Sequence, residues 1–150
     1  MNTVNIRPAV KKDIPQLFDL MYQYIVDYKC PRPSEASLKK LINHLLENPY
    51  EGIQFVAEKE TRHLVGFSTL YFTFNTLEVK RMAVLYDLFV KPDVRGQKIG
   101  EKLLQNCVTY IRENDYSHMI WETAYDNLAA QSLYDRIGAK KAVWLNYEIK

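Results

Sequence analysis

The chain has 150 residues, of which 47% are hydrophobic and 13% aromatic, and this composition excludes an intrinsically disordered protein. The length fits one domain over residues 1–150 with a core large enough to need no disulfide or metal. The 20 basic residues nearly balance the 18 acidic ones, and the net charge of +2 argues against a nucleic-acid-binding surface.

The first half of the chain predicts a short strand and two helices. The strand runs from Val4 to Arg7 and ends at Pro8. Apolar residues then recur at helical spacing over 13–28, where Asp13 can cap the helix, and again over about 34–48.

The second half predicts three antiparallel strands, followed by helices that alternate with strands. The strands are expected at 54–58, 64–75, 80–90, 118–123 and 140–149, and the helices at 99–114 and 127–137. The unit from 80 to 123 reads as strand, helix, strand, so its two strands should be parallel neighbours. A mixed α/β sheet with helices on both faces follows, and ligands should bind at the carboxyl ends of the parallel pair.

The cysteines and the first residues indicate the compartment. Two thiols, Cys30 and Cys107, in a chain with an ample core do not indicate a disulfide scaffold, and neither has a metal-ligand spacing. The start, Met1–Asn5, lacks the features of a signal peptide, and no apolar run reaches the length of a membrane span. We therefore expect a cytoplasmic protein without a membrane partner.

The loop before the helix at 99–114 is the first candidate site. Gly96 and Gly100 lie four residues apart there, and a residue without a Cβ lets the backbone approach a phosphate closely. The N–H groups of the loop and the helix dipole would attract an anion, and Arg95 and Lys98 would add positive charge. An ordinary glycine-containing turn is the alternative. The chain has neither the P-loop motif nor the dinucleotide-binding motif.

Asp87 is the second candidate because it interrupts an apolar strand. Regular alternation would place it on one face with Ala83, Leu85 and Phe89, and the opposite face is apolar as well. A buried carboxylate is costly unless it is paired, and such groups often have raised pKa values and carry out chemistry. The alternatives are a structural carboxylate bonded to N–H groups or an arginine, and a β-bulge that redirects the side chain.

Two further candidates accompany the helix at 127–137. Asn127 stands at its start and is expected to cap it. Tyr134 falls on its apolar face, so the hydroxyl needs a partner, although a core tyrosine is the alternative. Tyr28 belongs to a tyrosine-rich margin of the first helix, which is either the edge of the core or part of a substrate site.

These residues together resemble the GNAT family of N-acetyltransferases, and within it the spermidine/spermine and the yeast histone-and-polyamine acetyltransferases. The motifs that carry the similarity are Asp87-Leu88-Phe89-Val90-x-Pro92-x-x-Arg95-Gly96-x-x-Ile99-Gly100 and Trp121-x-Thr123-x-x-x-Asn127-x-x-Ala130-x-x-Leu133-Tyr134-x-x-x-Gly138. The resemblance implies a central sheet of six to seven mostly antiparallel strands. One parallel pair would be splayed at the cofactor cleft, with helices on both faces.

The resemblance also implies acetyl-CoA as the co-substrate, without a metal. Backbone groups of the strand before the loop would pair with the pantetheine arm, and those of the loop would bind the pyrophosphate. The helix that starts at Asn127 would line the other side. The residues expected to bind acetyl-CoA are Leu88, Phe89, Val90, Arg95, Gly96, Gln97, Lys98, Ile99, Gly100, Glu101, Asn127, Ala130 and Tyr134.

The chemistry follows from the same resemblance. Tyr134 occupies the position of the family's general acid and would protonate the departing thiolate. Asp87 is the candidate for the base that deprotonates the amine, and a backbone N–H near Leu88 would polarise the thioester. The residues expected on the acceptor side are Tyr28, Tyr86, Asp87, Ile120, Trp121 and Glu122.

The predicted reaction transfers an acetyl group to a primary amine of a small molecule, such as a polyamine or an amino acid. An amine of a protein or peptide is the alternative acceptor, and a non-catalytic acyl-CoA-binding module or a structural domain is the alternative of another class. Two positions depart from the family pattern: Lys98 replaces a loop glycine, and Tyr86 replaces a carboxylate of the spermidine/spermine enzymes. The oligomeric state stays open, with a homodimer as one expectation.

Overall fold

The computed structural model describes residues 3–150, in which five strands and four α-helices occur. The strands are β1 (Val4–Pro8), β2 (Gly52–Lys59), β3 (Leu64–Asn75), β4 (Lys80–Val90) and β5 (Met119–Ile120). The helices are α1 (Ile14–Asp27), α2 (Glu35–Glu47), α3 (Ile99–Glu113) and α4 (Leu128–Arg136). None of the helices in this part of the chain is long and apolar enough to cross a membrane.

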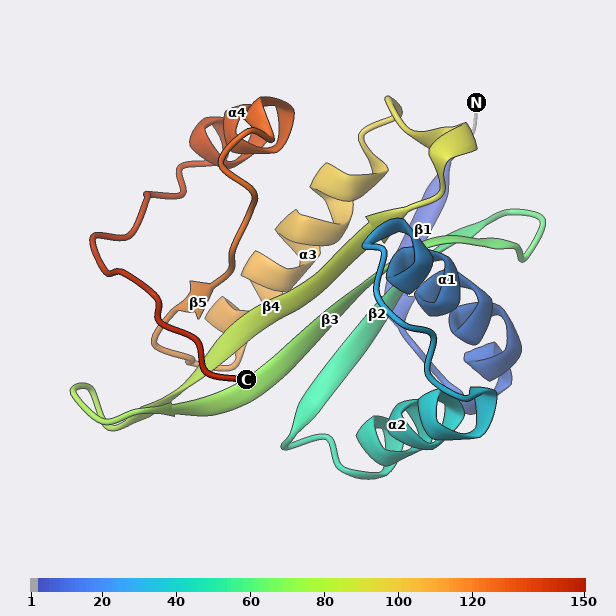
Figure 1. Ribbon diagram of the computed structural model, residues 1–150, viewed down its shortest axis with the longest axis horizontal. Helices are drawn as coiled ribbons and strands as arrows, with labels where there is room; N and C mark the ends of the chain where they lie inside the picture. Colours follow the sequence, from blue (N-terminus) through green and yellow to red (C-terminus); the bar gives the residue numbers. More distant parts are fainter. Residues whose placement is uncertain (1–2) are drawn as a thin grey trace.

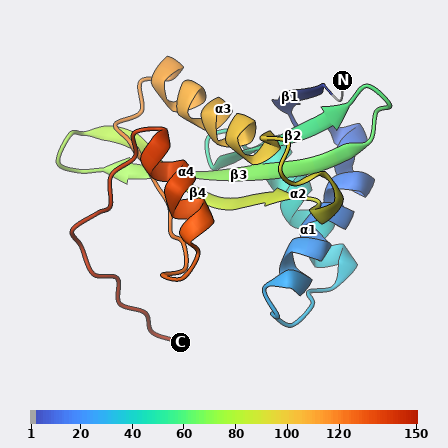
Figure 2. The same ribbon diagram turned by 90° about the horizontal axis from the view of Figure 1, so that it is seen from above.

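The strands form one mixed sheet in the order β1-β2-β3-β4-β5 (Figure 1). Neighbours from β1 to β4 run antiparallel, whereas β4 and β5 run parallel. Figure 2 shows α3 on one side of the sheet and α1 and α2 on the other, and each side buries its own apolar core. The predicted mixed sheet, its parallel pair and its two helical layers are therefore confirmed.

The predicted number of six to seven strands is wrong. The strand expected at 118–123 shortens to Met119–Ile120, and the one expected at 140–149 does not form. Side chains of the last segment alternate as in a strand, but a strand also needs hydrogen-bonding neighbours. Within residues 3–150, no backbone hydrogen bond joins that segment to the sheet.

β4 contains a β-bulge that the alternation in its sequence conceals. Asp87 pairs with Thr69 of β3, whereas the next residue of β3, Leu70, pairs with Leu85. Tyr86 is therefore an extra residue without a partner opposite it. Such an insertion moves every following side chain to the other face of the strand.

The bulge overturns the predicted face of Ala83, Leu85, Asp87 and Phe89. Leu85 packs in the core on the α3 side, but Phe89 packs in the core beneath α1 and α2. Asp87 and Phe89 are two positions apart in the strand, whereas the bulge separates Asp87 from Leu85, so Asp87 shares the face of Phe89. The carboxylate is thereby directed toward α1 rather than into the α3 layer.

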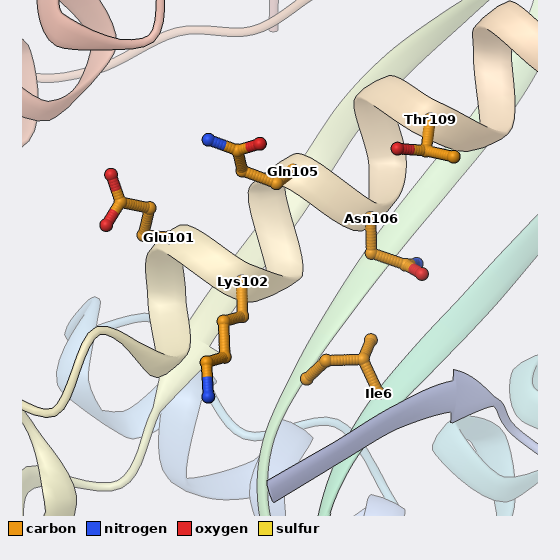
Figure 3. Close-up of a pocket in the computed structure, with 6 residues that line it drawn as sticks. All are labelled: Ile6, Glu101, Lys102, Gln105, Asn106 and Thr109. Atoms are coloured by element: carbon orange, nitrogen blue, oxygen red, sulfur yellow. The ribbon is translucent and has the colours of Figure 1, made fainter.

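A hollow of about 450 Å³ lies between α3 and β1 (Figure 3). Its lining residues are Ile6, Glu101, Lys102, Gln105, Asn106 and Thr109. Only Glu101 among them belongs to the predicted site. Neither Asp87 nor Tyr134 borders it, so the predicted chemistry has to be placed elsewhere.

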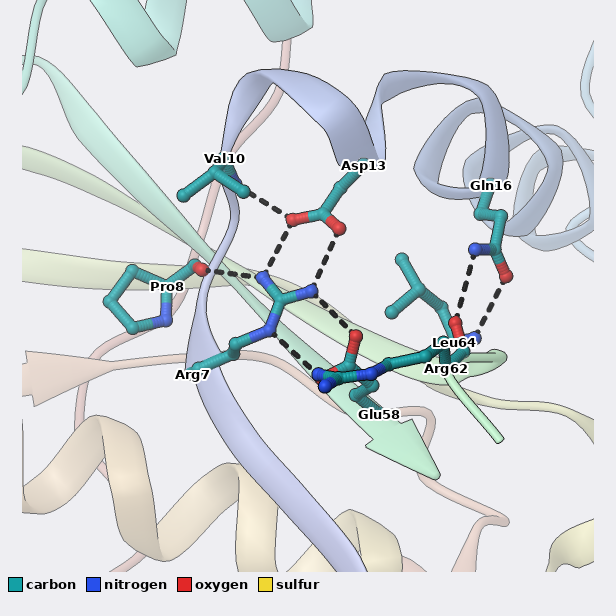
Figure 4. Close-up of polar contacts among 8 residues, drawn as sticks. All are labelled: Arg7, Pro8, Val10, Asp13, Gln16, Glu58, Arg62 and Leu64. Carbon is teal, nitrogen blue, oxygen red and sulfur yellow. Dashed lines mark hydrogen bonds and ion pairs between the residues drawn. The ribbon is translucent and has the colours of Figure 1, made fainter. Parts of the chain in front are cut away.

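A buried ion cluster joins β1, β2 and the start of α1 (Figure 4). The guanidinium of Arg7 lies 2.7 Å from the carboxylate of Asp13 and 2.9 Å from that of Glu58. Both carboxylates are buried, and hydrogen bonding to Arg7 lowers the pKa of each. Asp13 also accepts a bond from the N–H of Val10 at 2.8 Å. Its predicted role as a side-chain cap of α1 is wrong, because its carboxylate serves this cluster.

Candidate active site

The loop between β4 and α3 has the form of an anion-binding site. Gly96 adopts a φ of 84°, and a Cβ placed on it would meet nothing within 4 Å, so its surface is open. Lys98, the N-cap of α3, is also left-handed, with a φ of 63°, and it makes no side-chain cap bond. The first N–H groups of α3 have no acceptor within the helix, and they lie at its positive end.

Lys98 adopts the conformation that a glycine would adopt there at no steric cost. The lysine therefore preserves the shape of the loop, and its exposed side chain lies on the protein surface. Gln97 is exposed beside it, whereas the side chain of Ile99, the first residue of α3, is buried, so Ile99 can present only its backbone to a ligand.

Arg95 fixes the turn that leads into this loop. Its Nε donates to the carbonyl of Val90 at 2.9 Å, and its guanidinium lies 5.7 Å from the centre of the Phe89 ring. A distance of 4.0 Å separates Nη2 from the carboxylate of Asp27, the last residue of α1. The side chain is about half exposed, so positive charge remains at the rim of the loop.

β4 and β5 separate soon after they meet. They pair only at Ala83 with Met119 and at Val84 with Ile120, and the chain then leaves β4 and runs to α4 (Figure 1). From Leu85 to Val90, β4 has no strand on that side within residues 3–150. Backbone groups along this edge can pair with an extended ligand in the manner of an added strand.

Asp87 is 7% exposed and lies among hydroxyl groups. Burial raises the pKa of this carboxylate, and the nearby hydroxyl groups of Thr69, its neighbour on β3, and of Tyr24 on α1 lower the pKa by less. The net pKa of Asp87 is therefore raised. None of the ion pairs formed by residues 3–150 includes Asp87, so the alternative of an arginine partner is not realised.

Tyr24 is the residue that connects Asp87 to α1. Its hydroxyl donates to the carbonyl oxygen of Tyr86, the bulged residue, at 3.4 Å, and lies close enough to the Asp87 carboxylate to affect its pKa. Burial and the charge of Asp87 raise the pKa of Tyr24, so the phenol stays protonated. The sequence places Tyr24 in the tyrosine-rich margin of the first helix with Tyr22 and Tyr28 but does not connect it to Asp87, and it gives no signal for Thr69.

Aromatic rings surround the carboxylate. The rings of Tyr24 and Tyr28 lie 4.8 Å apart between centroids, and those of Tyr71 and Tyr86 lie 5.4 Å apart. Burial, and then the charge of Asp87, raise the pKa of Tyr71 to about 12. Tyr28 and Tyr86 are 67% and 66% exposed, so both rings are accessible to a ligand. Aromatic faces beside a carboxylate attract an organic cation.

Tyr134 lies on α4, which the chain reaches after β4 and β5 have separated. Its ring packs edge-on against Trp121, with centroids 5.3 Å apart, and its hydroxyl lies near Thr123. Burial and the nearby phenol of Tyr28 raise the pKa of Tyr134 by more than Thr123 lowers it. Tyr28, which packs against Tyr24, is therefore near Tyr134 as well. Within residues 3–150 this chain of phenols is the link between the neighbourhood of Asp87 and Tyr134, and no ion pair or ring contact joins the two predicted catalytic residues directly.

α4 is held in place at both ends. Asn127 accepts the N–H of Ala130 at 3.2 Å, which confirms the predicted cap. At the other end, Arg136 donates to the carboxylate of Glu101 in the first turn of α3, at 3.2 Å. Glu101, expected to bind the cofactor through its backbone, therefore also positions the helix that carries Tyr134.

The remaining residues expected on the acceptor side lie at the end of β5 and directly after it. Ile120 is partly exposed at the end of β5, and Glu122 is exposed two residues later. Glu122 accepts a bond from Asn146 at 3.0 Å, so the last segment of the chain reaches this side of the site. No three His, Cys, Asp or Glu side chains within residues 3–150 are arranged to hold a metal ion.

The sequence model of the acetyltransferase (GNAT) family matches residues 16–139. Over 139 residues the chain is 34% identical to an uncharacterized N-acetyltransferase, YhfO, of Bacillus subtilis (strain 168), with 90% of this chain and 89% of that protein covered. The crystal structure of a probable acetyltransferase matches 97% of both chains, with a TM-score of 0.89 at 28% identity.

An aminoglycoside N-acetyltransferase in complex with CoA matches 100% of this chain and 96% of its own, with a TM-score of 0.82 at 15% identity. At that identity the similarity concerns the fold alone. The same arrangement of sheet and helices is therefore compatible with a CoA complex in another protein.

Proposed function

This chain belongs to the GNAT family of acetyltransferases, and we propose that it transfers the acetyl group of acetyl-CoA to the primary amine of a small molecule. The observation that carries the choice of acceptor is the environment of Asp87. Asp87 is a buried carboxylate with a raised pKa that directly follows the exposed Tyr86, and its neighbour Tyr24 packs against the exposed ring of Tyr28.

The residues of the loop and of β4 fit acetyl-CoA, which supplies an activated acetyl group when it is bound. The open surface above Gly96 and the free N–H groups at the start of α3 suit a pyrophosphate. The unpaired edge of β4, including Leu88–Val90, suits the amides of the pantetheine arm. A pyrophosphate at one end of β4 and an extended arm along it need an open edge rather than a closed cavity.

Asp87 and Tyr134 have the protonation properties that the transfer requires. The acceptor amine has to lose a proton before its nitrogen forms a bond to the acetyl carbon, and Asp87 would take that proton, with Tyr24 holding the carboxylate. As the carbon–sulfur bond breaks, Tyr134 would donate its phenolic proton to the sulfur. The raised pKa of Asp87 makes it a stronger base, and the raised pKa of Tyr134 keeps the acid protonated at neutral pH.

The polar and aromatic groups favour a cationic amine with few charges. Tyr28 and Tyr86 offer ring faces to a cation, and Asp87 offers one negative charge. Tyr86 stands where the spermidine/spermine enzymes have a second carboxylate, which reduces the attraction for a long polycation. We therefore expect a higher kcat/KM with a short diamine or a basic amino acid than with spermine.

The acceptor can be identified by thiol release from acetyl-CoA over a panel of diamines, polyamines, amino acids and lysine peptides. We expect the highest kcat/KM with a short amine. Higher kcat/KM with lysine peptides would contradict the small-molecule acceptor. If CoA binds in calorimetry but no amine in the panel supports thiol release, the data favour an acyl-CoA-binding module instead.

Asp87→Asn is expected to lower kcat/KM by about 10²–10⁴-fold and to remove the limb of the pH–rate profile on which activity rises with pH.

The folding stability of Asp87→Asn, unlike its activity, should not fall at pH 7. Because the folded pKa of Asp87 is raised, its stabilising contribution is complete below the unfolded pKa of about 3.9 and is lost as pH rises through the folded pKa. Asparagine has no such loss, so the variant should be at least as stable as the wild type at pH 7.

The matched control for this variant is Asp115→Asn, because Asp115 is an exposed carboxylate in the turn after α3. The control should keep the wild-type rate and pH profile. A normal rate with an unchanged pH profile in Asp87→Asn would assign the base to another carboxylate or to water. Chemical denaturation at pH 7 supplies the stability comparison.

A further inference from the structure

A row of buried polar side chains crosses three adjacent strands, β2, β3 and β4 (Figure 1). Gln54 of β2 pairs with Thr69 of β3, and Thr69 pairs with Asp87 of β4. Residues that pair across antiparallel strands point to the same face of a sheet, so the three side chains share one face. None of the three is more than 7% exposed, although the core on this face is otherwise apolar.

The row lies on the face that α1 covers. Nε2 of Gln54 donates to the sulfur of Met21 on α1 at 3.4 Å, and Met21 belongs to the core between the sheet and the first two helices. This is the face to which the bulge directs Asp87. One end of the row is therefore Gln54, and the other end is the proposed base.

The amide of Gln54 acts as a donor toward Thr69. Its Nε2 lies 3.0 Å from Oγ1 of Thr69 and carries two protons, one for that oxygen and one for the sulfur of Met21. A thioether sulfur can only accept, so turning the amide round would place its oxygen against a second acceptor. The contact with Met21 thus fixes which end of the amide faces Thr69.

Donation from Gln54 leaves the proton of the Thr69 hydroxyl available to another acceptor. A threonine hydroxyl has one proton and two lone pairs, and Nε2 of Gln54 occupies one lone pair. The proton therefore points away from Gln54. The residue paired with Thr69 on its other side is Asp87, whose carboxylate is close enough for the hydroxyl to lower its pKa.

We propose that Gln54 is a positioning residue for Asp87, because it holds the hydroxyl of Thr69 with its proton directed at the carboxylate. This role rests on the proposed function, in which Asp87 takes a proton from the acceptor amine. Gln54 is buried behind Thr69 and acts through it.

The row helps to keep the base ionised. Burial favours the neutral carboxyl group and raises the pKa of Asp87, whereas the hydroxyl of Thr69 favours the carboxylate and lowers the pKa by less. A base has to be deprotonated before it can accept a proton, so unopposed burial would hold Asp87 in the inactive form. A hydroxyl proton limits the rise in pKa, whereas the full positive charge of an arginine would make the carboxylate a weak base.

The titratable groups around Asp87 are phenols. They are Tyr24 and, packed against it, Tyr28 on α1, and Tyr71 on β3 with Tyr86 on β4. The pKa of Tyr24 is raised and that of Tyr71 is raised to about 12, so both stay neutral while a carboxyl group titrates. None of the ion pairs formed by residues 3–150 includes Asp87. A shift in its pKa after a substitution in the row therefore reports on the row.

Carbon-13 NMR of the aspartate carboxyl carbons in the complete chain measures the pKa of Asp87, whose resonance is identified by its loss in Asp87→Asn. Thr69→Val should raise this pKa by about one unit, because a donor to the charged form is lost. Thr69→Ser keeps the hydroxyl and should keep the wild-type value. Gln54→Met should raise the pKa by about half a unit, because the hydroxyl keeps its proton but loses the partner that directs it.

The double variant Gln54→Met/Thr69→Val separates a positioning role from a structural one. If Gln54 acts through Thr69, the double variant should have the pKa of Thr69→Val, because no hydroxyl remains to be positioned. The matched control is Gln16→Met. Gln16 accepts from the N–H of Leu64 at 2.9 Å and lies outside the row, so its loss should lower stability and leave the pKa of Asp87 unchanged.

Steady-state kinetics of the same variants distinguish a failure of the positioning role from a failure of the proposed function. We expect the limb on which kcat/KM rises with pH to move to higher pH together with the NMR pKa, so that Gln54→Met loses about threefold in kcat/KM below the limb. An unchanged pKa in folded Gln54→Met, or the same shift with and without the Thr69 hydroxyl, overturns the positioning role. A pKa that moves while the kinetic limb stays in place overturns Asp87 as the base instead. Circular dichroism and the Tm confirm that each variant is folded.

Discussion

Tyr134→Phe is expected to lower kcat by about 10²–10⁴-fold while the Kd for CoA stays within about twofold of the wild type. The substitution removes one oxygen and keeps the ring that packs on Trp121. A phenolic proton is needed when the thiolate leaves and contributes little to the binding of CoA in the ground state. Its removal should therefore lower kcat and leave the affinity for CoA unchanged. Steady-state kinetics by thiol release and calorimetry with CoA measure the two quantities.

The control is Tyr125→Phe, the same change on a tyrosine that is 97% exposed in the loop before α4. It should leave kcat unaltered. A folded Tyr134→Phe enzyme with normal kcat would remove the general-acid role from this residue.

Arg7→Met is expected to destabilise the fold by about 3–5 kcal/mol at neutral pH. Methionine keeps an apolar side chain but leaves the carboxylates of Asp13 and Glu58 buried without their partner. The guanidinium ties β1 and β2 to the start of α1, so its removal weakens a junction between distant parts of the chain (Figure 4). Chemical denaturation measures the loss.

The effect of Arg7→Met should depend on pH in a defined direction. In the wild type the pKa values of Asp13 and Glu58 are lowered, so their stabilising contribution is present above the unfolded values of about 3.9 and 4.3. It is lost as pH falls through the folded values, and the difference between wild type and variant should shrink there. Lys39→Met, which breaks the surface pair with Glu35, should cost only about 0.5 kcal/mol. Equal losses in the two variants would contradict a special role for the buried cluster.

The helices and the long strands could be predicted because their signals are local. The strands at 64–75 and 80–90 and the helix at 99–114 coincide with β3, β4 and α3 to within one residue. Alternation, helical spacing and the glycines and prolines at their ends depend only on neighbours in the sequence. Asn127 as a cap of α4 follows from the same kind of information.

The bulge and the surroundings of Asp87 could not be predicted in this way. Tyr86 becomes an extra residue only when β4 is aligned with β3, so the direction of the carboxylate depends on a register between distant segments. Tyr24 and Thr69 reach Asp87 through that same register. The missing sixth strand has a related cause, since a sequence can contain the pattern of a strand without the neighbour that would complete it.

The bulge at Tyr86 also separates folding stability from acceptor preference under the proposed function, two properties that one substitution in an enzyme often changes together. The extra residue is two-thirds exposed, and β3 places no residue opposite it, whereas Asp87 beside it is held by the interior. Substitutions at 86 can therefore accumulate in a lineage, or be introduced by an engineer, with little loss of folding stability. Under the proposed function, acceptor preference can change through substitutions at position 86 while Asp87, the proposed proton acceptor, is retained.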